Sequence, residues 1–287
     1  MKKTRPSKGG FFYALVLRML ACSLFLDPSM NWNLLLNFTR QDLIDRHSAS
    51  VLGAAWTFIL PLINILIFTL VFSNIMGMRL GGLGQDLGKW GYSVYLVSGL
   101  LAWNCFAATL TRITGVFHEK AHLIGKVRLS LWSLPLFVVL SETVHYLIAT
   151  GFFMVFLIAI GFDFSWHLLW WIPIFLCQQL LAYALGITCA ILSVFIRDIT
   201  QVVGVVTQLW FWLTPIVYVA NILPGTIQQL VALNPFYHLV LAYRAALIGG
   251  QAPHLLSIGL LVAFSLALLG VSIFVGRKLE RDIRDFL

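Results

Sequence analysis

The sequence has few charged residues. Asp, Glu, Lys and Arg make up only 10% of its 287 residues, whereas 60% are hydrophobic and the mean hydropathy is +0.91. A soluble domain carries about a quarter charged residues, so this composition excludes a soluble globular protein. Because the polar segments are all short, it also excludes a sizeable soluble domain. We expect one membrane-embedded domain over residues 31–287.

Cysteine is also scarce. Each cysteine stands alone inside an apolar run, and no CxxC pair occurs among Cys22, Cys105, Cys177 and Cys189. Disulfide frameworks and zinc sites are recognised by the spacing of several cysteines. We therefore expect these four to behave as small buried hydrophobes, and we expect no metal ion or cofactor in this chain.

The sequence contains long apolar runs instead. A helix needs about 20 apolar residues to cross a hydrocarbon layer of roughly 30 Å, and runs of this length recur along the chain. They predict an all-α polytopic membrane protein with six transmembrane helices, at roughly residues 54–77, 92–116, 135–160, 168–195, 202–219 and 255–275.

The basic residues indicate the orientation of these spans. Lys and Arg collect on the cytoplasmic side of membrane proteins, so we interpret the net charge of +8 as topology rather than as nucleic-acid binding. Most of the 19 Lys and Arg residues fall in the N-terminal segment, the loops after spans two and four, and the tail. The opposite loops contain only Arg79, Lys89 and Arg244. We predict an inner-membrane protein with both termini in the cytoplasm.

The first thirty residues resemble a signal peptide, because basic residues precede an apolar run from Phe11 to Leu26. Arg18 interrupts this run, however, and cleavage would require an N-terminus outside the cell, against the charge distribution. We therefore expect residues 1–30 to form an interfacial or disordered extension.

The next segment, Asn31–Leu52, is amphipathic. Its apolar residues Trp32, Leu35, Leu36, Leu43 and Ile44 point largely to one side of a helix, away from most of its polar residues. This pattern predicts a helix on the cytoplasmic surface of the membrane. A helix packed within the protein remains the alternative.

The stretch Ala220–Pro253 is apolar but is divided by several Pro and Gly residues. Its two longer pieces, Thr226–Leu233 and Phe236–Ile248, are too short to cross a membrane. They predict two short re-entrant helices between spans five and six, whose irregular joints are buried in protein. Alternatively, they only cover the outer surface.

The string His118-Glu119-Lys120-Ala121-His122 matches HExxH, which can hold zinc on a helix with the glutamate as general base. An intramembrane zinc metalloprotease is therefore a competing hypothesis. A catalytic zinc needs a third protein ligand, and no later span offers a convincing acidic residue. The motif also lies in a lysine-flanked cytoplasmic segment rather than inside an apolar helix.

The loop Gly81–Trp90 resembles a phosphate-binding loop, but it departs from the GxxxxGK[ST] pattern at two positions. Leu83 stands where the first glycine belongs, and Trp90 replaces the hydroxyl residue that holds magnesium. We therefore expect no ATPase activity in this chain.

Two ionisable residues lie within the third span. Glu142 and His145 are three residues apart and thus share one face of a helix. An acid at membrane depth is usually functional or paired, so Glu142 is expected to bind His145 or a polar group on another helix. It lies either in the membrane core or near the cytoplasmic interface.

Aromatic residues are abundant, and two groups of them, in spans one and five, are harder to explain as belts at the membrane interfaces. An aromatic surface lets the apolar face of a sugar pass without a deep binding well, as conduction requires. Packing or lipid contact is the alternative for any single ring. The candidates for a substrate channel are Trp56, Phe58, Phe68 and Phe72 in span one, and Trp210, Phe211, Trp212 and Tyr218 in span five.

Taken in order, several strings resemble one known family: "SVLGAAWTFILPLINILIFTLVFSNIMG" at 50–77, "HLIGKVRLSLWSLPL" at 122–136, "FIRDI" at 195–199, "WFWLTPIVY" at 210–218 and "LNPFYHLVLAYRAALIGG" at 233–250. They are similar to the permease subunits of ABC transporters that export O-antigen, capsule and teichoic-acid polymers. The resemblance covers about residues 31–287. The family's aromatic-Pro-Arg motif is replaced here by Leu129-Ser130-Leu131.

This resemblance implies a homodimer with a channel between the protomers, bound to two copies of a separate cytoplasmic ATPase that holds the ATP and Mg²⁺. It implies export of a lipid-linked polysaccharide, with export of drugs or lipids as the alternative. By position, ATPase coupling falls to Arg40, Asp42, Glu119, Lys120, His122, Lys126, Arg128, Arg197 and Asp198. The re-entrant exit helices contain Asn234, Pro235, Phe236, Tyr237 and Arg244.

Overall fold

The computed structural model describes residues 32–46, 53–71, 90–124, 131–220 and 223–287. Within these ranges every regular element is helical, in agreement with the predicted fold class. The elements are α2 (Trp32–Asp45), η1 (Gly53–Ala55), α3 (Trp56–Thr69), α4 (Gly91–Glu119), α5 (Ala121–Ile124), α6 (Leu136–Ala159), η4 (Trp166–Trp170), α7 (Trp171–Phe195), α8 (Ile199–Leu213), α9 (Gly225–Ala232), α10 (Pro235–Leu247), α11 (Leu255–Lys278) and α12 (Glu280–Phe286).

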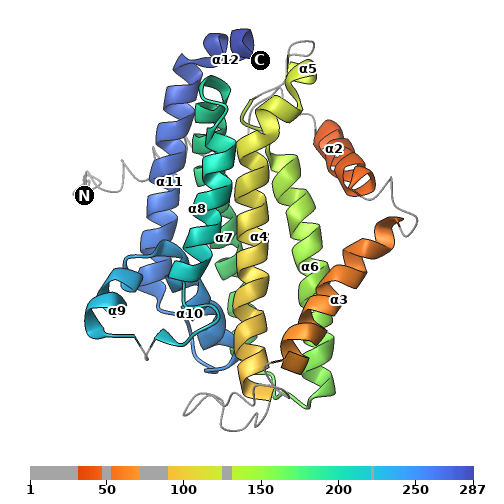
Figure 1. The fold of residues 1–287 in the computed structure, drawn as a ribbon, viewed down its shortest axis with the longest axis vertical. Coiled ribbons are helices and arrows are strands. Elements are labelled where there is room, and N and C mark those ends of the chain that lie inside the picture. Colours follow the sequence, from red (N-terminus) through yellow and green to blue (C-terminus); the bar gives the residue numbers. More distant parts are fainter. Residues whose placement is uncertain (1–31, 47–52, 72–89, 125–130, 221–222) are drawn as a thin grey trace, which may run out of the picture.

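The long helices form an up-and-down bundle around α4 (Figure 1). One end of the bundle carries α5, α12 and the turn between α7 and α8, with α2 beside it; we call this the α12 end. The opposite end carries α9, α10 and η4. The first and last described helices, α2 and α12, therefore lie towards the same end of the molecule.

Among the described residues, four helices are long and apolar enough to cross a membrane: α4, α6, η4 with α7, and α11. They coincide with predicted spans two, three, four and six. The remaining two predicted spans are shorter here. Helix α3 has 14 residues, and the rest of span one after residue 71 lies outside the described residues.

Helix α8 ends at Leu213, six residues before the predicted end of span five. Thr214 is extended, with φ −101° and ψ 130°, because the ring of Pro215 disfavours a helical conformation in the residue before it. An irregular segment over residues 214–220 follows. Span five is therefore a helix of 15 residues and a non-helical continuation.

The two short helices predicted after span five are present as α9 and α10, and they meet at an angle of 93°. Asn234 and Pro235 explain the corner. The Asn234 side chain accepts a hydrogen bond from the Phe236 amide at 3.0 Å, which caps α10. Pro235 takes the first helical position, where its missing N–H costs nothing.

Helices α4 and α7 approach each other closely at Gly186. A Cβ atom at this position would lie only 2.8 Å from Cβ of Ile113 on α4. Small residues permit such close packing of membrane helices. Around this contact, the fully buried side chains of Phe117, Phe137 and Leu269 form part of the core near the α12 end.

Candidate functional site

The turn between α7 and α8 lies at the α12 end and consists of Ile196, Arg197 and Asp198, all of which are exposed. A short charged turn between two apolar helices is the part of this hairpin that a soluble partner can reach. The structure thus places the predicted coupling residues Arg197 and Asp198 at an accessible tip.

Three further coupling residues lie at the same end, where α4 passes into α5. Glu119 and His122 are exposed, and Lys120 pairs with Glu119 at 2.7 Å while its ammonium group lies 5.5 Å from the Phe137 ring centroid. The predicted coupling residues Lys126 and Arg128 lie outside the described residues.

The HExxH string does not form a pair of free histidines. The His118 Nε2 lies 2.8 Å from the carbonyl oxygen of Ser193 on α7, so it donates a hydrogen bond there, while His122 is exposed. Among the described residues, no group of three His, Cys, Asp or Glu is placed to hold a metal ion. His118 serves here as a link between α4 and α7.

Helix α12 contacts both of these predicted coupling segments. Ile283 is fully buried, the Arg284 Nη1 donates to the carbonyl oxygen of Ile124 on α5 at 3.3 Å, and Phe286 packs on Phe195 with ring centroids 5.4 Å apart. The C-terminal helix therefore touches both α5 and the end of α7. No sequence pattern predicted these contacts.

Helix α2 packs on the side of α6 (Figure 1). Leu35 and Thr39 are buried against the bundle, and the Phe38 ring lies 6.0 Å from that of Phe137. Trp32 and Ile44 remain more than half exposed. The amphipathic helix thus has both features considered above, a face packed on protein and an exposed apolar edge. Arg40 is exposed.

Asp42 of α2 joins a cluster of four charged side chains between α2, α4 and α6. Asp42 pairs with Arg112 of α4 and accepts a hydrogen bond from Ser141. Glu142 of α6 pairs with Arg112 at 2.8 Å and also with Arg46. We call Asp42, Arg46, Arg112 and Glu142 the charge cluster. Two positive and two negative groups balance each other there.

His145 is the neutral member beside this cluster. Its Nδ1 lies 2.8 Å from the Ser141 carbonyl and donates to it, so Nε2 carries the lone pair and accepts from Arg46 Nη1 at 3.2 Å. The predicted link between Glu142 and a polar group on another helix is thus present through Arg112 and Arg46. Glu142 lies in the second turn of α6, six residues from its start at the α12 end.

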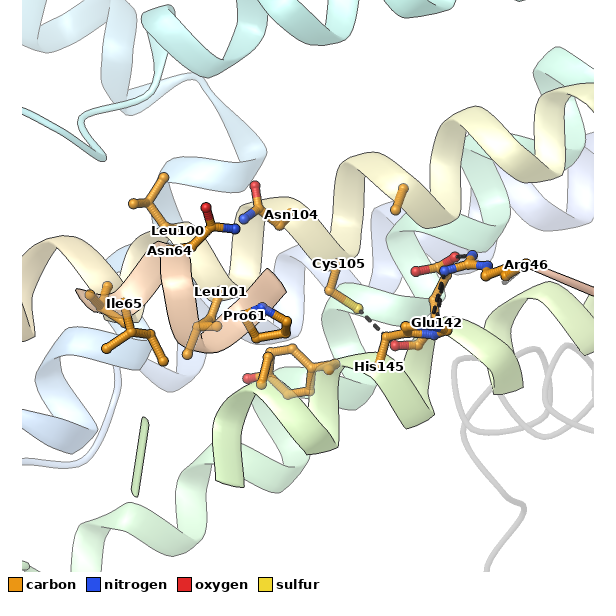
Figure 2. A pocket seen from close by; sticks show the side chains of 14 residues that line it. Arg46, Pro61, Asn64, Ile65, Leu100, Leu101, Asn104, Cys105, Glu142 and His145 are labelled. Carbon is orange, nitrogen blue, oxygen red and sulfur yellow. Dashed lines mark hydrogen bonds and ion pairs between the residues drawn. The ribbon is translucent and has the colours of Figure 1, made fainter. Parts of the chain in front are cut away.

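A pocket of about 240 Å³ adjoins the charge cluster and opens between α3, α4 and α6 (Figure 2). Arg46, Glu142 and His145 line one end of it. Asn64 of α3 and Asn104 of α4 line another part, and most of the remaining wall is apolar: Pro61, Ile65, Val97, Leu100, Leu101, Cys105, Ala108, Tyr146 and Ala149.

The predicted channel aromatics of span five are distributed over different environments. Trp210 and Phe211 contact Trp103 of α4, with ring centroids 6.0 and 5.8 Å apart. Trp212 is 60% exposed, and the half-buried Tyr218 donates to its carbonyl oxygen at 2.9 Å. Trp212 therefore presents the largest free aromatic surface of the four.

In span one, Trp56 is half-buried at the start of α3. The side chains of Phe58 and Phe68, and all of Phe72, lie outside the described part of the structure. The channel prediction for those three residues therefore stays a prediction.

The rings of Trp103 and Phe106 on α4 lie 4.9 and 4.7 Å from that of Phe236 on α10, in an arrangement typical of favourable aromatic pairs. The Trp210 indole donates to the Asn234 side chain at 2.8 Å. Asn234 and Phe236, predicted to belong to the exit helices, thus fasten the corner between α9 and α10 to the bundle, while Tyr237 is half-buried.

Arg244 of α10 is a buried cation held by main-chain carbonyl groups. Its Nη1 and Nη2 donate to Pro215 and Ile216 at 2.8 Å, and its Nε donates to Tyr95 at 3.3 Å. The guanidinium carbon also lies 3.4 Å from the Tyr95 ring centroid. Arg244 therefore ties the irregular segment after α8 to both α4 and α10, and we call this arrangement the arginine clamp.

Comparison with known proteins identifies the family of this chain. Residues 33–248 match the ABC-2 type transporter family. The chain is 28% identical to the O-antigen export system permease protein RfbA of Klebsiella pneumoniae over 258 residues, which cover 89% of this chain and 95% of that protein.

Two further relatives are more distant. The O-antigen export system permease protein RfbA of Myxococcus xanthus is 26% identical over 86% of this chain and 93% of its own length. The inner membrane transport permease YadH of Escherichia coli strain K12 is 24% identical over 74% of this chain and 83% of its own length. Since the family match covers well over half of the sequence, the chain belongs to the ABC-2 type transporter family.

Proposed function

We propose that this chain is the membrane-spanning subunit of an ATP-driven exporter that moves a lipid-linked, O-antigen-like polysaccharide across the inner membrane. The observation that carries the proposal is the extent of the match to the relatives named as O-antigen export permeases. It covers 95% and 93% of their lengths, and 89% and 86% of this chain. The fold itself does not distinguish polysaccharide from drug or lipid substrates.

In this proposal residues 31–287 form one transmembrane domain with six crossings by α3, α4, α6, α7, α8 and α11. Helix α8 spans only about 22 Å at 1.5 Å per residue, so the irregular segment after it completes the crossing. Helix α2 lies at the cytoplasmic surface, and α9 and α10 form the re-entrant pair at the exit. The basic α12 end faces the cytoplasm, in accordance with the positive-inside rule.

Two copies of the chain pair around the substrate path and bind two copies of a separate cytoplasmic ATPase. The exposed apolar residues of α3 and α8, such as Leu66, Ile67, Val205 and Leu209, leave a surface for a second copy. ATP and Mg²⁺ belong to the partner. Its closure would press on the α12 end and shift the packing of α3 and α8, so this chain performs no covalent chemistry.

Deletion of this chain alone is the test of the proposed function. We expect cells that lack it to lose the surface polysaccharide and to accumulate the lipid-linked polymer at the inner side of the membrane, as judged by surface labelling and by extraction of the glycolipid. A plasmid copy should restore both. Normal surface polysaccharide after deletion would contradict the proposal.

The coupling turn between α7 and α8 gives a second prediction. The double variant Arg197→Ala, Asp198→Ala should reduce association with the ATPase at least about tenfold, because both side chains are exposed at the tip and few other groups there can replace them. Co-purification with the tagged ATPase measures this. Arg277→Ala, which removes an exposed charge from α11, is the matched control; equal retention of the ATPase by both variants would refute the assignment.

A further inference from the structure

The pocket between α3, α4 and α6 contains two amide side chains without a partner among the described residues. Asn64 and Asn104 both line it and are both exposed, and neither makes a hydrogen bond in the part of the chain that the structure describes. Their amide groups point towards one another (Figure 2). An amide in an otherwise apolar membrane helix is costly unless it is satisfied, so these two groups point to a polar occupant.

The charges at the other end of the pocket favour a neutral occupant. Arg46 is already engaged by Glu142, by Asp42 at 3.8 Å and by His145. Arg112 is engaged by Asp42 and Glu142 in the same way. A phosphate group in the pocket would therefore meet the Glu142 carboxylate without gaining an unpaired cation. Hydroxyl groups, in contrast, can donate to this carboxylate and exchange hydrogen bonds with the amides.

The volume and the wall of the pocket further restrict which kinds of ligand can bind. Its volume of about 240 Å³ is several times the roughly 30 Å³ that one water occupies in the liquid. It lies below the 300–1,000 Å³ typical of sites for drug-sized molecules. The apolar wall offers contact for C–H groups. One or two sugar rings combine hydroxyl groups with apolar faces and fit this volume.

We infer that this pocket is a binding site for an uncharged sugar unit of the exported polymer, held by the amides of Asn64 and Asn104. The inference rests on the proposed function, because it takes the sugar from the polysaccharide substrate. It adds a site inside one protomer, beside the path between protomers.

Photo-crosslinking in cells that make the polymer tests the site. An amino acid with a diazirine side chain is placed at Ala149, which lines the pocket. The matched control is Leu147 of the same helix, which is 60% exposed and points roughly away from Ala149, because residues two apart are about 200° apart on a helix. We expect adducts that react with polymer antibody at position 149 and not at position 147.

The amides provide the second arm of the experiment. The double variant Asn64→Leu, Asn104→Leu should lower the yield of polymer adduct at position 149 about tenfold, the effect of losing one to two hydrogen bonds. When the diazirine amino acid is placed instead at Trp212, on the exposed face of α8, the same double variant should leave the yield of polymer adduct unchanged. This comparison separates loss of the pocket from loss of the protein.

Three outcomes would overturn the inference. These are an adduct at position 149 with a second copy of the chain, an adduct there with phospholipid alone, or a polymer yield that the double variant leaves unchanged. Each of them leaves the proposed function intact, since export is measured separately by surface labelling of the same cells. If surface polysaccharide instead appeared normally in cells that lack this chain, the proposed function itself would be wrong.

Discussion

Replacing Arg112 with methionine should destabilise the protein by about 3–5 kcal/mol, the usual cost of breaking a buried ion pair by removing one partner. Arg112 bridges Asp42 and Glu142, whose side chains are 10% and 4% exposed. Without it, both carboxylates depend on Arg46 alone. In detergent, we expect the apparent melting temperature to fall by roughly 10 °C, and α2 to become accessible to protease.

A neutral double variant is the control for this prediction. Arg112→Met combined with Glu142→Gln removes one charge of each sign and leaves Asp42 paired with Arg46. It should recover most of the lost melting temperature, because the cost comes from the unbalanced charge rather than from the missing contact. If the double variant is as unstable as the sum of the two single variants, the charge cluster does not act as one unit.

Replacing Arg244 with leucine should have a comparable effect through a different mechanism. The carbonyl groups of Tyr95, Pro215 and Ile216 would lose their donor in a buried setting, and each unsatisfied group costs about 1–3 kcal/mol. The segment after α8 would lose its fixed position relative to α10. We expect a drop of roughly 10 °C in melting temperature and faster proteolysis between α8 and α9.

The substitution Arg244→Lys tests whether the arginine clamp needs the planar fork or only the charge. Lysine presents a single ammonium group and cannot reach three separated carbonyl oxygens at once, so we expect little recovery. Arg281→Met removes an exposed arginine from α12 and serves as the control. Full recovery by lysine would show that the positive charge alone holds this segment.

Much of the helical pattern could be predicted from sequence, because apolar runs and their Pro and Gly boundaries are local signals. The corner at Asn234-Pro235 is a good example, since the cap and the proline both act within a few residues. The end of α8 at Leu213 could also have been predicted, because Pro215 disfavours a helical conformation in the residue before it. The apolar run continues past this proline, however, and therefore suggested a longer helix.

The charge cluster was only half predictable. The sequence indicated that Glu142 needs a partner, but the pairing depends on the rotation of α4 against α6 and on where α2 docks. Arg112 could have been found by comparing how far each residue lies from the same end of the bundle. Arg112 lies seven residues before the end of α4, and Glu142 lies six residues after the start of α6. In antiparallel neighbours these positions are level. No local signal places Arg46 there.

The aromatic residues show why a channel is difficult to predict from composition. Trp210, Phe211 and Trp212 are consecutive, and successive residues on a helix point about 100° apart. They cannot all face the same path. Only the three-dimensional packing shows that Trp210 and Phe211 meet Trp103, whereas Trp212 contacts Phe211 and stays 60% exposed.

The close approach at Gly186 has a mechanical consequence. Ile113 lies so near Gly186 that even one added Cβ there would clash with it, so sliding α4 along α7 would bring Ile113 against residues that do carry a Cβ. Helices α4 and α7 are thus expected to keep a fixed position relative to each other. In the proposed exporter, movement driven by the partner ATPase is therefore expected in α3 and α8 rather than between α4 and α7.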